Sequence, residues 1–92
     1  MDIGLLTFQI VIPHSRSLKD KRQVIRSLRD RLKKFNVSIA ECDHQNLCQR
    51  STVGVVSISS SHSVLEKTLQ SIENEVEKTL DGDVIHTRVE YL

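Results

Sequence analysis

The segment of residues 15–35, SRSLKDKRQVIRSLRDRLKKF, constrains the fold more than any other part of the chain. Ser17, followed three residues later by Asp20, resembles a capping box and predicts that a helix begins at Ser17. No Gly or Pro interrupts the segment, and Asn36 tolerates the left-handed conformation in which helices commonly end. An amphipathic helix of about four turns is therefore predicted. Its apolar seam consists of Leu18, Ile25, Leu28, Leu32 and Phe35, widened by Val24.

Strand patterns surround this helix. Residues 3–12 alternate with the period of two that a sheet requires, and Pro13 ends the run because proline cannot donate to a ladder. Residues 37–44 and 52–59 predict a second and a third strand, joined by a turn at 45–50. Gly54 either weakens the third strand or permits close approach of another group.

A second helix follows a serine-rich break. Ser63 and Glu66 form a capping box by spacing, so this helix is expected to begin at Ser63. Its outer face is mildly acidic, and residues 81–83 are a turn signal. The last strand is predicted at residues 84–92, with Ile85, Val89 and Tyr91 on one face. The seam of the second helix consists of Leu65, Leu69, Ile72, Val76 and Leu80.

The resulting order is βαββαβ in one domain spanning residues 1–92, long enough for a single modest core. Right-handed crossovers favour an α+β, ferredoxin-like sandwich. Its four-stranded antiparallel sheet is expected in the order 4-1-3-2, with both helices on one face.

Positive charge is concentrated in the first helix. Between His14 and Lys34, nine basic side chains face only Asp20 and Asp30, a local balance of +7 in a chain whose net charge is +1. Five of them repeat at helical spacing beside the seam, over about 21 Å. A solvated helix face is the simplest interpretation. A row of like charges also favours an anionic partner, either nucleic-acid phosphate or the acidic second helix of a neighbouring subunit. This basic stripe consists of Lys19, Arg22, Arg26, Arg29 and Lys33.

The predicted topology also gathers polar residues at one end of the sheet, where the loop of residues 13–17 meets the turn at 45–50. This end is a candidate anion or polar site beside the positive N-terminus of the first helix, or simply a hydrated end of a small domain. No metal or other cofactor is predicted, because Cys42, His44 and Cys48 lack the Cys-x-x-Cys knuckle typical of zinc sites. The rim, as we call it, comprises His14, Arg16, His44, Gln45, Asn46 and Arg50.

Several function classes are disfavoured. The loop PHSRS has no glycine to let backbone N–H groups wrap a phosphate, and no nucleophile–base pair is visible, so an enzyme is not expected. The aromatic residues Phe8, Phe35 and Tyr91 all lie on predicted core faces, which argues against base stacking. The apolar run near the N-terminus is too short to span a bilayer, and two cysteines make no disulfide framework. A cytoplasmic protein with reduced thiols and no membrane partner is expected.

The segments SLKDKRQVIRSLRDRLKKFNVSIAE and DHQNLCQRSTVGVVSIS resemble the bacterial YlxP-like family, domain of unknown function 503. The resemblance rests on LKDKR at 18–22, FNVSIAE at 35–41 and DHQ at 43–45. It implies a ferredoxin-like fold. It also implies a ribosome- or RNA-associated role, since genes of this family often neighbour those of translation-initiation and ribosome-maturation factors. It supplies no catalytic residues. Cys42 and Cys48 depart from the family pattern, which argues against cysteine chemistry.

Three functional hypotheses follow. The first is a non-enzymatic RNA- or ribosome-associated protein that binds through the basic stripe and the rim, with contacts mostly to the backbone. The second is a homodimeric module that pairs through the open sheet face, where Leu5 and Val11 lie among polar residues. The third is a small-anion or hydrolytic site near Arg16 at the rim.

Overall fold

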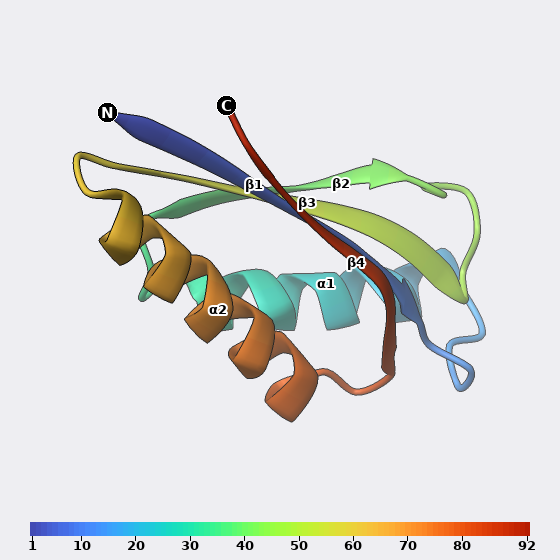
Figure 1. Ribbon diagram of the computed structural model, residues 1–92. Coiled ribbons are helices and arrows are strands. Elements are labelled where there is room, and N and C mark those ends of the chain that lie inside the picture. The colour runs from blue at the N-terminus through green and yellow to red at the C-terminus, as the bar shows by residue number, and fades with distance from the viewer.

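The computed structural model describes all residues, 1–92, and confirms the predicted architecture (Figure 1). A four-stranded antiparallel sheet has the order β2-β3-β1-β4, which is 4-1-3-2 read from the other edge. Both helices cover one face of this sheet, and the other face is open. The elements in chain order are β1 (Asp2–Val11), α1 (Leu18–Leu32), β2 (Val37–Asp43), β3 (Arg50–Ser59), α2 (His62–Thr79) and β4 (Asp83–Tyr91).

One core lies between the sheet and the two helices. It uses the predicted seams, with Leu18 and Phe35 of the first seam only half-buried at its two ends. Alternation in the strands places Leu6 and Phe8 of β1 toward the helices while Leu5 and Thr7 face the open side. The buried apolar residues are Leu6, Phe8, Ile10, Ile12, Ile25, Leu28, Leu32, Val53, Val55, Leu65, Leu69, Ile72 and Val76.

The helix boundaries differ from the prediction at two of four ends. Ser17 caps α1 as predicted, because its Oγ accepts a hydrogen bond from the Asp20 N–H at 3.1 Å. However, α1 ends at Leu32, and the Asn36 side chain instead donates to the Ile58 carbonyl of β3. The predicted start of α2 at Ser63 is also wrong. Ser61 has extended backbone angles and accepts from the Val64 N–H, so the N-cap lies two residues earlier than predicted and the helix starts at His62.

The last strand contains an irregularity that the sequence pattern did not indicate. Thr7 pairs with Arg88, whereas Gln9 pairs with Ile85, so β4 has an extra residue between these pairs. His86 there has a φ of 53°, as expected at a bulge. The predicted common face of Ile85, Val89 and Tyr91 is therefore wrong, because the bulge moves Ile85 to the open side.

Tyr91 is not a core residue, contrary to the prediction. It lies near the end of the edge strand β4, where 44% of it remains exposed. Its ring instead packs against the imidazole of His62 at the start of α2, with 4.7 Å between ring centroids.

Candidate nucleic-acid interface

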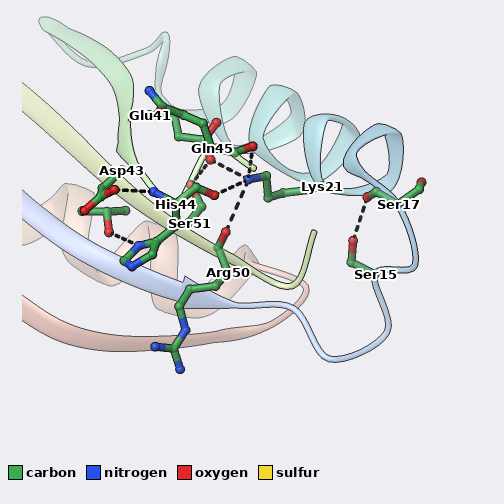
Figure 2. A network of polar contacts seen from close by, with 10 residues as sticks. Ser15, Ser17, Lys21, Glu41, Asp43, His44, Gln45, Arg50 and Ser51 are labelled. Atoms are coloured by element: carbon green, nitrogen blue, oxygen red, sulfur yellow. Dashed lines mark hydrogen bonds and ion pairs between the residues drawn. The ribbon is translucent and has the colours of Figure 1, made fainter. Parts of the chain in front are cut away.

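A buried lysine organises the end of the sheet at which the candidate site was predicted. Lys21 lies on the core side of α1 and is only 1% exposed. Its ammonium group donates to the carbonyls of His44, Gln45 and Arg50 at 2.8, 3.1 and 3.4 Å (Figure 2). It also forms an ion pair with Glu41 Oε2 at 2.8 Å. Lys21 therefore holds the loop between β2 and β3 against α1.

Glu41 completes this network from β2. The same Oε2 accepts a hydrogen bond of 2.6 Å from the Ser51 hydroxyl of β3. Ser51 is buried, and no buried side-chain nitrogen or oxygen in the chain lacks a hydrogen-bond partner. Because a buried ammonium ion is stable only when its charge and hydrogen bonds are satisfied, Glu41 and the three carbonyls are needed together.

The loop between β1 and α1 is joined to the same hairpin loop. The Ile12 N–H donates to the Gln49 carbonyl, and the Gln49 side chain donates to the carbonyls of Pro13 and Ser15. The Ser15 hydroxyl, which is buried, donates to the Ser17 carbonyl. The two predicted loops therefore lie side by side, held by one backbone hydrogen bond and two from the Gln49 side chain.

Lys21 is one of the nine basic side chains counted between His14 and Lys34, and its burial was not predicted. The roles of Glu41, Ser51 and Gln49 were not predicted either. The sequence does contain a signal for this buried pair. Lys21 lies four residues before Ile25, so helical spacing places it on the apolar seam of α1. Strand alternation likewise places Glu41 on the core side of β2. A cation and an anion that both occupy core positions predict each other as partners.

The rim residues do not converge on one site. Gln45 and Asn46 are exposed in the hairpin loop, and the His44 Nδ1 pairs with the Thr52 hydroxyl at 2.9 Å. His14 instead approaches Asp81, with 3.2 Å between Nε2 and Oδ2, in the turn before β4. The Arg50 side chain points away from Lys21, and its pairing with Val11 places it on the open face of the sheet (Figure 2).

The N-terminus of α1 is occupied by the protein's own groups. The Asp20 carboxylate accepts the Arg16 N–H at 2.9 Å, and Ser17 accepts the Asp20 N–H. An incoming anion near Arg16 would meet the negative charge of Asp20. The third hypothesis, a small-anion or hydrolytic site, gains no support from this geometry.

Cysteine and histidine side chains near the hairpin face different neighbours. Cys42 is exposed and its Sγ lies 3.5 Å from the Ala40 carbonyl, whereas the Cys48 Sγ lies 4.0 Å from the Ser15 carbonyl. His44 contacts Thr52. No three His, Cys, Asp or Glu side chains gather as a metal site would require.

The basic stripe is intact and exposed. All five of its members are solvent-exposed, and the only ion pair among them joins Lys33 to Asp30 at 3.2 Å. Arg16, just before the start of the same helix, is also exposed, and like the other four members of the stripe it makes no ion pair. The free cations are therefore Arg16, Lys19, Arg22, Arg26 and Arg29.

The other cations of this segment have structural partners. Arg31 donates to the Thr79 carbonyl at 2.9 Å, and Lys34 pairs with Glu75 at 2.7 Å, so both connect α1 to α2. The hydrogen bond from Lys34 lowers the pKa of the Glu75 carboxyl below its usual range. Glu75 is therefore ionised at neutral pH, and Lys34 is not a free charge.

The stripe runs along the flank of α1 that adjoins β2. A groove of about 260 Å³ lies between this flank and the strand. Because β2 is an edge strand, nothing in the chain covers the stripe on its outer side. The groove is lined by Arg29, Leu32 and Lys33 of the α1 end and by Val37, Ser38 and Ile39 of the β2 end.

Neither α1 nor α2 has the length and apolar character that a membrane-crossing helix needs.

Comparisons with known proteins place this chain among relatives without an assigned activity. The chain is 39% identical over 71 residues to the "Uncharacterized protein YlxP" of Bacillus subtilis (strain 168), covering 76% of this chain and 77% of that protein. The profile of the family described as "Protein of unknown function (DUF503)" matches residues 3–89. The chain therefore belongs to the DUF503 family, as the resemblance in its sequence indicated.

Proposed function

We propose that this protein is a non-enzymatic RNA-binding protein that docks on structured RNA, such as that of the ribosome, through the basic stripe. The carrying observation is the row of five exposed cations on one flank of α1, of which all but Lys33 lack a carboxylate partner. A surface helix that served only solubility would do so equally well with mixed charges, whereas unpaired cations in a row favour the binding of a polyanion.

The aromatic residues favour backbone contacts over base readout. Phe8 is buried, and Phe35 is half-buried against the core. Tyr91 is exposed, but it packs on His62 and lies on β4, at the sheet edge opposite β2. No aromatic face is therefore offered beside the stripe for a base to stack on, and the RNA contacts are expected to be phosphate contacts.

Reversing two charges in the middle of the stripe tests this proposal. The double variant Arg22→Glu/Arg26→Glu is expected to weaken binding to a structured RNA about tenfold or more at low salt, since two phosphate contacts become repulsions. The slope of log K against log salt concentration should fall by about 2, one for each lost contact. Fluorescence anisotropy over a salt series measures both quantities.

The matched control is Lys67→Glu/Lys78→Glu, which makes the same change in net charge on α2. Both lysines are exposed and unpaired. The control should retain most of the RNA affinity. If the two double variants weaken binding equally, the effect is one of net charge alone and the stripe is not the interface.

The open sheet face favours a second role, self-association. Val56 and Ile58 of β3 are 37% and 43% exposed there, and Leu5 and Ile3 pair beside them in β1. An apolar area on the face that no helix covers suits a two-fold contact with a second copy.

Light scattering at micromolar concentration tests this role. The wild-type chain is expected to be a dimer, and Val56→Lys should shift it to a monomer because the lysine charge would be buried in the contact. Val64→Lys is the control, since Val64 is 52% exposed but lies on α2. A monomeric wild-type protein would contradict self-association while leaving the RNA proposal untouched.

A further inference from the structure

The edge strand β2 is open to strand addition. It bonds to β3 on one side only, and its pairing is regular from Val37 to Glu41. Proteins commonly block such edges with proline, lysine, an inward-pointing charge or a bulge. The β2 sequence, VSIAECD, contains neither proline nor lysine, and its one irregularity falls beyond Glu41. Its inward-pointing charge, Glu41, is compensated within the chain by Lys21. The opposite edge, β4, is interrupted in its middle by the bulge at His86.

The groove beside this edge has an apolar floor and a cationic wall. Val37 and Ile39 are half-buried on the helix side of β2, and Leu32 closes the floor from α1. Arg29 and Lys33 stand above them on the flank of the helix, and Arg29 has no acidic partner. Apolar atoms beneath a cationic wall suit a side chain that has an apolar stem and an anionic end, as glutamate does.

We propose that the β2 edge and this groove bind an extended, acidic segment of a partner protein by strand addition. The main chain of that segment would bond to the free N–H and C=O groups of β2. Every second side chain of that segment, a glutamate, would point into the groove, where its methylene groups would lie over Val37 and Ile39 and its carboxylate would pair with Arg29 or Lys33. Main-chain pairing supplies affinity, and the groove supplies selectivity for an acidic residue at every second position.

A second copy of this chain is a poorer occupant of the edge. Pairing β2 with β2 of another molecule about a two-fold axis would bring the two basic stripes side by side, and their like charges would repel. Pairing β2 with β4 of another copy would fail at the bulge around His86. Charge and strand geometry both favour a foreign acidic segment.

This inference does not depend on the proposed function. The RNA proposal is tested at Arg22 and Arg26 in the middle of the stripe, whereas the groove uses its C-terminal members, Arg29 and Lys33. Failure of RNA binding would leave the strand-addition site standing, and the reverse also holds.

The test uses a fluorescein-labelled peptide as long as β2, with alternating Val and Glu, and a matched peptide in which every Glu is Lys. The full-length chain should bind the acidic peptide at least about tenfold more tightly than the basic one. Amide hydrogen exchange of residues 37–41 should slow when the acidic peptide is added. Arg29→Glu should weaken this binding about tenfold, whereas Lys78→Glu on α2 should not.

Three results would overturn the proposal: equal binding of both peptides, slowed exchange confined to other elements, and no difference between Arg29→Glu and wild type. Light scattering is read in parallel. If residues 37–41 are already protected in a dimer of the wild-type chain, a second copy occupies the edge and the proposed acidic partner is wrong. Circular dichroism of Arg29→Glu verifies that the variant is folded.

Discussion

Replacing Lys21 with alanine is expected to lower the free energy of unfolding by about 3–5 kcal/mol, the cost of breaking a buried ion pair by removing one partner. The substitution strips the Glu41 carboxylate of its counter-ion and leaves three carbonyls of the hairpin region without their donor. Lys21 itself is 1% exposed and the Glu41 side chain 21%, so the carboxylate left behind would be only partly hydrated. Chemical denaturation followed by circular dichroism measures the loss.

Two further variants separate the buried network from the general effect of losing a lysine. Lys19→Ala removes an exposed, unpaired cation two residues away and should change stability by no more than about 0.5 kcal/mol. The double variant Lys21→Met/Glu41→Leu should recover the part of the loss that comes from the unpaired Glu41 charge. It should not recover the part that comes from the three carbonyls, which still lack a donor. If Lys21→Ala and Lys19→Ala are equally stable, the network does not hold the hairpin.

The fold was predictable because its signals are local and periodic. Helical spacing in the two seams and alternation in residues 3–12 each identify one element, and the handedness of crossovers then leaves one strand order. Ser17 was found because its capping partner Asp20 lies within one turn. The basic stripe follows from the same helical spacing, so its position on one face of α1 also needed no tertiary information.

The remaining features depend on contacts between distant segments. The Lys21 ammonium group meets carbonyls more than twenty residues away, and the His14 imidazole is drawn from the rim to Asp81. The bulge at His86 depends on how β4 registers against β1, which no local pattern records. The exposure of Tyr91 was also not predictable from the sequence, because alternation does not reveal how far a helix extends over an edge strand.

Gly54 illustrates how a local signal becomes specific only in the structure. A strand glycine suggests close approach of another group, and here the Cys42 Sγ lies 2.8 Å from where a Cβ would stand. Cys42 is exposed and can rotate aside. Gly54→Ala is therefore expected to lose no more than about 1 kcal/mol, at the lower end of the cost of overpacking.

Gly82→Ala is expected to be far more damaging, at about 2–4 kcal/mol, and to lower the melting temperature by roughly 10–20 °C. A Cβ at this position would lie 2.6 Å from the Val11 carbonyl oxygen. That oxygen belongs to the backbone of β1, which pairs with Asp83 beside it and so cannot turn aside. Gly82 also has a φ of 158°, a conformation that residues with a Cβ rarely adopt.

The comparison between the two glycines isolates the cause. Cys42→Ala should relieve the loss in Gly54→Ala, because it removes the atom that the new methyl group meets. No single side-chain deletion should relieve Gly82→Ala, because its obstacle is main chain. Differential scanning calorimetry measures these differences in four variants: Gly54→Ala, Gly82→Ala, Cys42→Ala and the double variant Cys42→Ala/Gly54→Ala. Equal melting temperatures for Gly54→Ala and Gly82→Ala would show that the turn before β4 adjusts as easily as an exposed side chain.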